Sequence, residues 1–377
     1  MEGHGEFRAF CSAEVRLLGL EEGRERLRGS LEDPEGTVLV ASSGTVSRLG
    51  MEALAPEGIR IVSGFSSDPT VDDLRGCLTA LSGRKVGRLV CVGGGSTIDM
   101  GKALCAMLGM EGGAPESYDG LCEAIQNKRY VRADRGIELI AFPTTAGTGS
   151  EVTPWATIWD LRGGRKLSVD MPALTPDLAA IVPGFTTHMP ARLTLSTGLD
   201  ALAQAMESFW SRARDPLCQA LALEGIRRIR THLPAALSRP GEMEHREGMC
   251  LGALLSGLAF SRTRTTACHS ISYPITIRHG VEHGLAVAVT LEEVARIDRS
   301  AVPEIERIYD IFGGPQGLHR WLEETSRPIQ PLRLSAMGIT EQDLPALVDG
   351  AFTQGRMDNN PVPLGREDVE GILRRVL

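Results

Sequence analysis

Several side chains in the second half of the chain are spaced as metal ligands could be. Asp200 and Gln204 are four residues apart in a helical pattern, so their side chains share one helix face. His269, His279 and His283 follow within fifteen positions. A carboxylate and two imidazoles suit a borderline divalent cation such as Zn²⁺ or Fe²⁺, with an open position for a substrate. The alternative is an aspartate bonded inside its helix and histidines satisfied by their neighbours.

A glycine-rich turn, Gly93-Gly-Gly-Ser96, joins an expected strand at 88–92 to an expected helix at 97–108. Ser96 and Asp99 are spaced as a capping box for that helix. Glycine lets the backbone approach a ligand closely, and a helix start offers free N–H groups to a phosphate, so the turn suits a pyrophosphate. A tight turn with no ligand is the alternative. The spacing fits neither a Walker A loop nor G-x-G-x-x-G, whose last glycine would fall on Ile98.

A second loop of small residues, Thr144-Thr-Ala-Gly-Thr-Gly-Ser150, follows an expected strand at 138–142. Hydroxyl residues and glycines at the carboxyl end of a parallel strand are what a ligand in the crevice of the sheet would contact. Two such loops on one sheet indicate a long ligand such as a dinucleotide.

The helices and strands that must position these residues differ between the two halves of the chain. Short apolar runs alternate with helical or glycine-rich stretches in the first half, which is typical of a parallel sheet covered on both faces. The expected strands are 37–41, 60–62, 88–92 and 138–142, and a hairpin follows at 155–160 and 165–170. The later segments have helical periodicity at 193–210, 217–237, 244–260, 283–296 and 303–312. The pattern predicts an α/β domain over 1–183 and an all-helical domain over 184–377.

The composition is that of an ordinary globular protein and excludes several classes of function. The chain has 377 residues, 42% of them hydrophobic, and a net charge of −8, which argues against nucleic acid or an anionic membrane as the main partner. The eight cysteines include no C-x-x-C pair, as expected of a reduced intracellular protein. The start, MEGHGEFRAF, lacks the pattern of a signal peptide, and no apolar run is long enough to span a membrane. We therefore expect a cytoplasmic protein.

Four motifs, taken in order, resemble the iron-containing, or group III, alcohol dehydrogenase family over roughly residues 35 to 377. They are Gly93-Gly-Gly-Ser-Thr-Ile-Asp99 with Lys102, Pro143 to Glu151, Thr197-Gly-Leu-Asp-Ala-Leu202, and His269 with His283-Gly284. The resemblance implies a dehydroquinate synthase-like architecture: a dinucleotide-binding α/β domain followed by an all-helical metal-binding domain.

The resemblance also assigns roles to individual residues. Implied contacts of the NAD(P)H cofactor are Gly94, Gly95, Ser96 and Asp99 near the pyrophosphate, then Thr144, Thr145, Thr148, Ser150 and Lys166. Asp200, His269 and His283 match three of the four metal ligands of the family. Gln204 stands where the fourth ligand is usually histidine, and an amide oxygen is a harder and weaker donor than imidazole.

Two further departures concern the proton and the cofactor. Tyr273 stands where the family often has another histidine, and it could donate a proton or simply pack; His279 is the second candidate proton donor. Ser42 stands just after the first expected strand, where members that prefer NAD commonly carry aspartate. Without a carboxylate to repel a 2′-phosphate, NADPH becomes acceptable.

These features together suggest reversible reduction of an aldehyde to a primary alcohol. Three arginines near the expected site, Arg262, Arg264 and Arg278, suit an anionic substrate, and phosphonoacetaldehyde is the specific expectation. The alternative is that these arginines form surface salt bridges. The other functions considered are a metal-independent reductase of the maleylacetate reductase type, a general short-chain alcohol dehydrogenase, a dehydroquinate-synthase-like lyase and an inactive binding protein. We expect a homodimer.

Overall fold

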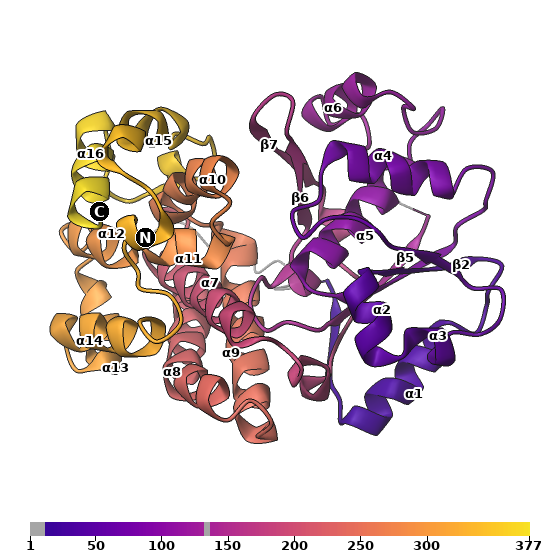
Figure 1. The fold of residues 1–377 in the computed structure, drawn as a ribbon, viewed down its shortest axis with the longest axis horizontal. Coiled ribbons are helices and arrows are strands. Elements are labelled where there is room, and N and C mark those ends of the chain that lie inside the picture. The colour runs from indigo at the N-terminus through magenta and orange to yellow at the C-terminus, as the bar shows by residue number, and fades with distance from the viewer. Residues whose placement is uncertain (1–11, 132–135) are drawn as a thin grey trace, which may run out of the picture. The chain divides into compact units, whose positions relative to one another are not determined.

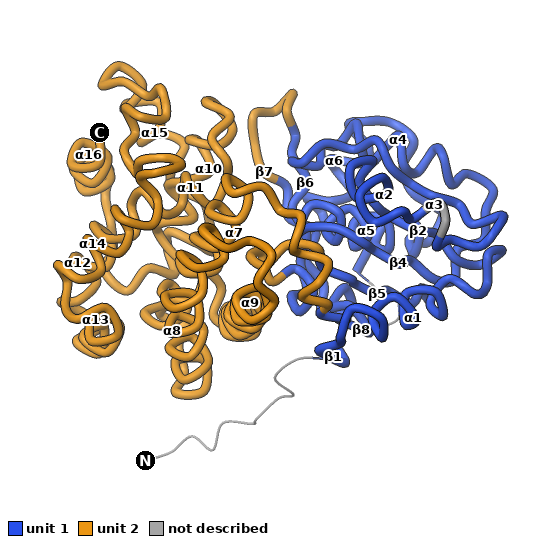
Figure 2. Tube along the Cα trace, turned by 60° about the horizontal axis from the view of Figure 1, so that its bottom comes forward, with its two compact units in different colours: residues 1–143, 150–160, 167–181 blue, residues 144–149, 161–166, 182–377 orange. Residues whose placement is uncertain are grey.

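The computed structural model describes residues 12–131 and 136–377, which form two compact units (Figure 2). The first unit comprises residues 1–143, 150–160 and 167–181, and the second comprises 144–149, 161–166 and 182–377. Two short loops from the first half of the chain therefore belong to the second unit. Cys11 and the ten residues that argue against a signal peptide lie outside the described residues.

The first unit is built on a six-stranded sheet in which every neighbouring pair is parallel. Its strands are β1 (Glu14–Leu17), β2 (Thr37–Ala41), β3 (Arg60–Val62), β4 (Arg88–Gly93), β5 (Glu138–Pro143) and β8 (Leu178–Ile181), in the order β1-β8-β5-β4-β2-β3. The four strands expected from the sequence are confirmed. The sequence analysis missed β1 and β8, because each has four residues and neither is a run of β-branched side chains.

Helices connect these strands from β1 as far as β5, as is usual for parallel pairing. They are α1 (Leu20–Ser30), α2 (Ser43–Leu49), α3 (Met51–Leu54), α4 (Val71–Ala80), α5 (Gly95–Leu108) and α6 (Tyr118–Gln126) (Figure 1). Side chains of α4, α5 and α6 join those of β2, β4 and β5 in one buried cluster. The central strands read as continuous apolar runs because both of their faces are covered.

The expected hairpin is confirmed as a separate two-stranded sheet of β6 (Trp155–Asp160) and β7 (Arg165–Asp170). Its tip, residues 161–166, belongs to the second unit and carries Lys166. Short 3-10 turns flank these strands at η1 (Ser150–Val152), η2 (Pro172–Leu174) and η3 (Pro183–Thr186).

The helix after β4 begins earlier than expected, which overturns the predicted capping box. Gly94 is the N-cap, so Ser96 lies inside the first turn and donates its hydroxyl to the carbonyl of Ser67 instead. Asp99 accepts from the hydroxyl of Ser150 at 2.5 Å and from the backbone N–H of Thr157 at 2.8 Å. The capping pattern failed because these longer-range partners take both polar side chains.

The second unit is helical apart from its two loops. Its helices are α7 (Ala191–Trp210), α8 (Pro216–Ser238), α9 (Met243–Thr263), α10 (Ala267–His279), α11 (His283–Ala288), α12 (Leu291–Asp298), α13 (Glu306–Phe312), α14 (Pro315–Ser326), α15 (Leu344–Gly350) and α16 (Arg366–Arg375). The 3-10 turns are η4 (Pro303–Ile305), η5 (Ser335–Met337), η6 (Glu341–Asp343) and η7 (Met357–Asn359). Among the described residues no helix is both long and apolar enough to cross a membrane.

The single helix expected over 283–296 is wrong, because the chain breaks between α11 and α12. The Thr290 hydroxyl donates to the carbonyl of Val287, where it competes with the backbone ladder. The expected helix over 303–312 is shorter as well, since Pro303 opens a 3-10 turn before α13.

Candidate active site

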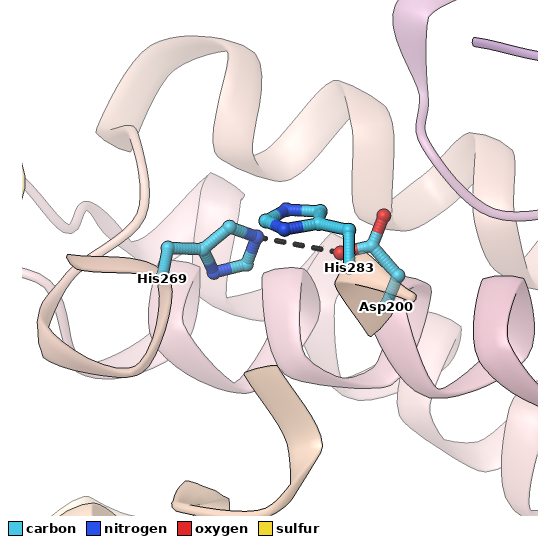
Figure 3. A group of neighbouring side chains, drawn as sticks. All are labelled: Asp200, His269 and His283. Carbon is cyan, nitrogen blue, oxygen red and sulfur yellow. Dashed lines mark ion pairs between the residues drawn. The ribbon is translucent and has the colours of Figure 1, made fainter. Parts of the chain in front are cut away.

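Asp200, His269 and His283 meet in the second unit, although they come from three different helices (Figure 3). One ligand atom from each lies within 4.8 Å of the other two. The Nε2 atom of His269 is 3.4 Å from Oδ1 of Asp200, and the two imidazole centroids are 5.3 Å apart. Asp200 and His269 are buried, and His283 is partly buried. The fold therefore brings together a carboxylate and two imidazoles at the spacing of a metal centre.

Gln204 lies one helical turn after Asp200 and belongs to the same group. Its Nε2 atom donates to Oδ2 of Asp200 at 3.0 Å and to the carbonyl of Thr148 at 3.4 Å. Within the described part of the chain, three buried atoms of the group have no hydrogen-bond partner: Oε1 of Gln204, Oδ1 of Asp200 and Nδ1 of His283. Each unsatisfied buried polar atom costs roughly 1–3 kcal/mol. A divalent cation would satisfy the two oxygens, so the residues present fit a metal.

The charge states of Asp200 and His283 suit a cation as well, and His269 must release a proton when a cation binds. Burial by itself raises the pKa of Asp200, but the adjacent imidazoles of His269 and His283 hold it below its usual range. Burial lowers the pKa of His283 to about 4. The group therefore offers an ionised carboxylate and a neutral imidazole, the states in which these side chains bind metals.

Glu207, which the sequence analysis did not identify, lies directly behind this group. It is fully buried, and its Oε2 atom accepts a hydrogen bond from Nδ1 of His269. Burial by itself lowers the pKa of His269, but Glu207 and Asp200 together raise it to about 10. The available signal was the spacing: Asp200, Gln204 and Glu207 follow at intervals of four and three residues on one helix face.

Tyr273 lies against the metal group and is bonded to the hairpin tip. Its ring stacks on that of His283, with 5.9 Å between centroids and 6° between planes. Its hydroxyl accepts from Nζ of Lys166 at 3.0 Å. Burial by itself raises the pKa of Tyr273, but the charges of Lys166 and Arg356 lower it to about 7. Lys166, which the resemblance assigns to the cofactor, thus has a partner within its own unit.

A cavity of about 210 Å³ in the second unit opens beside Tyr273. Its lining includes three cationic side chains, Arg165, Lys166 and Arg278. The remaining lining residues are Gly164, Tyr273, Pro274, Ile277, Gly350 and Thr353. A small cavity with this lining could hold an anionic group next to the metal centre.

Of the three arginines expected near the substrate, only Arg278 lines this cavity. Arg262 pairs with Asp215 at 3.5 Å, as the surface salt-bridge alternative predicted. Arg264 caps the end of α9 with a positive φ of 60°. His279, on the last turn of α10, is partly exposed and does not line the cavity. The structure therefore places Arg278 beside Tyr273 at this cavity, whereas Arg262, Arg264 and His279 are not among its lining residues.

The residues expected to hold the cofactor follow the ends of three adjacent strands. Ser42 follows β2, Gly94 follows β4, and Thr144 follows β5, and all three strands are parallel neighbours. Gly94 and Gly95 start α5 with β-region φ and ψ at Gly94, which leaves the first N–H groups of this helix for a ligand. Ser42 accepts a hydrogen bond from the N–H of Thr45 and so caps α2. This edge of the sheet is where a ligand of a parallel α/β fold binds.

Asp99 and Ser150 are linked to a buried lysine inside the first unit. Lys102 is fully buried and donates to the hydroxyl of Ser150 at 2.9 Å and to the carbonyl of Trp155 at 2.9 Å. The Ser150 hydroxyl in turn donates to Asp99. These bonds hold the start of β6 against α5 and shape the loop, while direct contact of Asp99 and Ser150 with a cofactor stays a prediction.

The loop at 144–149, which carries Thr144, Thr145 and Thr148, packs on the helices of the second unit. Gly149 has a φ of 62°, and a Cβ atom there would lie 2.6 Å from the Cα of Gly257. Only glycine fits that close approach. The carbonyl of Thr148 accepts from Gln204, so this loop is bonded to the helix that carries Asp200. One loop of the cofactor motif is therefore fixed directly to the metal-binding helix.

Comparison with known proteins gives one consistent result. Residues 35–183 match the family model described as "Iron-containing alcohol dehydrogenase", and residues 194–377 match "Fe-containing alcohol dehydrogenase family, C-terminal". A phosphonoacetaldehyde reductase from Streptomyces viridochromogenes is 32% identical over 305 residues, which is 75% of this chain and 74% of that protein. The NAD-dependent methanol dehydrogenase of Bacillus methanolicus is 28% identical over 301 residues, 77% of each.

Solved structures agree with the sequence comparison. Sulfoacetaldehyde reductase from Bifidobacterium kashiwanohense, crystallised with NAD⁺, matches with a TM-score of 0.85 and 26% identity. The match covers 97% of both chains. The expected order, an α/β part with a parallel sheet followed by a helical part, is confirmed.

Proposed function

The chain belongs to the iron-containing alcohol dehydrogenase family, and from this premise we propose that it reduces a small aldehyde reversibly to the primary alcohol with a nicotinamide cofactor. One observation carries the proposal. Asp200, His269 and His283 converge within 4.8 Å, and the neighbouring Gln204 presents an unpaired amide oxygen. The described residues provide no hydrogen-bond donor for Oδ1 of Asp200 or Oε1 of Gln204, and a divalent cation would bind both oxygens.

The chemistry divides between the bound groups and the side chains of this chain. When bound, the cation supplies Lewis acidity at the carbonyl oxygen and the nicotinamide supplies hydride. Asp200, Gln204, His269 and His283 would hold the cation. Fe²⁺ is the choice that the family favours, and Zn²⁺ is the alternative.

Tyr273 is the residue we favour for supplying the proton to the oxygen of the product. It touches His283 by stacking, and its hydroxyl is held at 3.0 Å by the ammonium of Lys166. A tyrosine hydroxyl can accept one hydrogen bond and donate another, so Tyr273 can accept from Lys166 and also donate its proton to a substrate. His279 is a weaker candidate because it lies on the last turn of α10, outside the cavity that Tyr273 lines.

The cofactor is expected along the strand ends that carry Ser42, Gly94 and Thr144. Ser42 directly follows β2, the strand whose end commonly carries a ribose-binding carboxylate in NAD-specific folds. Its hydroxyl caps α2, and a 2′-phosphate there would meet no acidic side chain at position 42. We therefore propose that NADH and NADPH are both accepted.

The substrate we favour is a small anionic aldehyde, and phosphonoacetaldehyde is the specific proposal. Lys166, Arg278 and Arg165 line one cavity with Tyr273, so an anionic tail could lie among cations near the reacting carbonyl. Guanidinium groups suit phosphonate and sulfonate oxygens because they bind them in bidentate geometry. The names of two relatives, a phosphonoacetaldehyde reductase and a sulfoacetaldehyde reductase, support this substrate class, whereas a methanol dehydrogenase favours a neutral alcohol.

The metal assignment is tested with Asp200→Ala and, as a matched control, Asp343→Ala, which removes a partly exposed carboxylate of the same unit that accepts hydrogen bonds from Thr340. Metal content and turnover of a short-chain aldehyde are measured on both variants. We expect loss of metal and of activity in the first variant alone. Full metal content together with full activity in Asp200→Ala would refute the assignment. A metal-free but active wild type would favour the metal-independent reductase that Gln204 suggests.

The substrate class is tested by NADH and NADPH oxidation with phosphonoacetaldehyde, sulfoacetaldehyde, acetaldehyde and butanal. Arg278→Gln should raise KM for the two anionic aldehydes and leave butanal unaffected. Arg262→Gln is the matched control, since Arg262 pairs with Asp215 and does not line the cavity. Better turnover of butanal than of either anionic aldehyde would refute the anionic substrate.

We also propose that the protein acts as a cytoplasmic homodimer. The edge strand β1 exposes all four of its residues, including Val15 and Leu17, and exposed edge strands favour pairing between chains. None of the seven cysteines among the described residues is in a disulfide, which suits a reducing compartment. Light scattering of the purified protein tests the dimer, and Val15→Lys should shift it toward monomer.

A further inference from the structure

Glu207 is a buried carboxylate with a complete set of donors. It lies on α7 three residues after Gln204 and is fully buried. Its Oε1 atom accepts from the backbone N–H of Thr266 at 3.0 Å, from the hydroxyl of Thr266 at 2.9 Å and from the backbone N–H of His269 at 3.3 Å. Its Oε2 atom accepts from Nδ1 of His269. Burying a carboxylate costs folding free energy unless donors of this kind surround it, so these hydrogen bonds are what allow Glu207 to lie inside the protein.

The contact with Nδ1 decides which nitrogen of His269 faces the metal group. A carboxylate only accepts, so Nδ1 must carry the proton that is shared with Oε2. The other nitrogen, Nε2, is directed to Asp200 at 3.4 Å and has its lone pair available to a cation once its own proton is displaced. We propose that Glu207 is the positioning residue of the metal centre: it fixes the orientation and tautomer of His269 and thereby sets the affinity for the cation. This inference rests on the proposed metal site.

Glu207 also has a structural role that must be separated from this one. Its Oε1 atom accepts from the N–H groups of Thr266 and His269, at the N-terminal turn of α10, and so caps that helix from α7. The two roles use different oxygens. Glu207→Gln separates them, because the two backbone donors hold the amide oxygen in the Oε1 position. The amide NH₂ then faces Nδ1 of His269 and donates to it.

In Glu207→Gln the proton of a neutral His269 must therefore move to Nε2, the nitrogen that should bind the cation. The measurement is the affinity of metal-depleted protein for Zn²⁺ at one fixed pH, by competition with a chromophoric chelator. We expect Glu207→Gln to bind Zn²⁺ about 10- to 100-fold more weakly than the wild type, in line with the effect of such supporting contacts. The melting temperature of the metal-free variant should stay near that of the metal-free wild type.

Thr266→Val is the matched control. It removes one hydrogen bond on the Oε1 side, together with the bond that the Thr266 hydroxyl accepts from Nε1 of Trp210, and leaves the contact with Nδ1 of His269 in place. We expect its Zn²⁺ affinity to change less than that of Glu207→Gln, even where its melting temperature falls further. Equal weakening of Zn²⁺ binding in both variants would show that capping alone matters and would overturn the proposal.

Two further outcomes are decisive. Zn²⁺ binding by Glu207→Gln within about threefold of the wild type overturns the role of Glu207 alone. No Zn²⁺ binding by the wild type overturns the metal site itself, and the positioning role with it. Should Glu207→Gln fail to fold, Glu207→Asp keeps the acceptor charge at the cost of a methylene. Binding within about tenfold of the wild type then supports the proposal, and weaker binding overturns it.

Discussion

Replacing Asp298 with asparagine should make the stability of the protein less dependent on pH. Asp298 ends α12 and is fully buried. Its Oδ1 atom accepts from Nδ2 of Asn360 at 2.8 Å and from the N–H of Val362 at 3.4 Å. Its Oδ2 atom has no hydrogen-bond partner in the described part of the chain. Burial raises the pKa of Asp298 from 3.8 to about 7, so the folded protein prefers the protonated acid.

The size of the change in the free energy of unfolding follows from this difference in pKa between the folded and unfolded states. Between about pH 4 and pH 7 the folded state binds more protons at Asp298 than the unfolded state does, so the free energy of unfolding falls as the pH rises. The difference between a pKa of 3.8 in the unfolded state and about 7 in the folded state lowers the free energy of unfolding by roughly 4 kcal/mol over the whole titration. About 2.5 kcal/mol of this loss falls between about pH 5 and pH 8. Asparagine has the shape of the protonated acid and does not titrate.

The assay is urea unfolding of the wild type and Asp298→Asn at about pH 5 and pH 8. The free energy of unfolding of Asp298→Asn minus that of the wild type should increase by about 2.5 kcal/mol from about pH 5 to about pH 8. Asp343→Asn is the control: hydrogen bonds from the N–H and hydroxyl of Thr340 hold the pKa of Asp343 below its usual range, so it is ionised in both states throughout this window. A difference between Asp298→Asn and wild type that is the same at both pH values would refute the reasoning.

Three other outcomes follow from the structure. Gln204→His should strengthen Zn²⁺ binding about tenfold, measured by chelator competition, because imidazole is the better donor; unchanged affinity would mean that position 204 does not ligate. Gly101→Ala should cost about 1–3 kcal/mol in urea unfolding, since its Cβ would lie 2.1 Å from Sγ of Cys91, whereas Gly76→Ala, with open space, should stabilise by about 0.5–1 kcal/mol. Burial lowers the pKa of His232, so the charged form is disfavoured in the folded state and the free energy of unfolding should fall as the pH drops below 6.5. His232→Gln should make that fall less steep in urea unfolding. The same pH profile in the variant and the wild type would contradict this role of His232.

The sequence by itself determined the elements and the chemistry of the ligands. Buried strands at 37–41, 88–92 and 138–142 could be predicted because parallel strands covered on both faces read as continuous apolar runs. The glycine-rich turn at 93–95 could be placed because it stands where one such run ends. The types of Asp200, His269 and His283 were enough to suggest a cation, since donor chemistry does not depend on the fold.

The capping box and two short strands were predicted wrongly or missed because their partners are distant in the chain. The capping box at Ser96 and Asp99 was wrong because Ser67, Ser150 and Thr157 supply the hydrogen bonds instead. A local pattern cannot reveal such partners, since the gain from a bond does not depend on separation along the chain. The edge strand β1 and its neighbour β8 were missed for a related reason: four residues become a strand only when a neighbour supplies the ladder.

Only the tertiary structure decided which charged side chains act together. Arg262 and Arg278 look alike in the sequence, but one pairs with Asp215 while the other lines a cavity beside Tyr273. Glu207 looks like any helix carboxylate until α10 brings His269 against it. The physical reason is that burial and contact set the cost of a charge, and both are properties of packing between helices rather than of spacing within one.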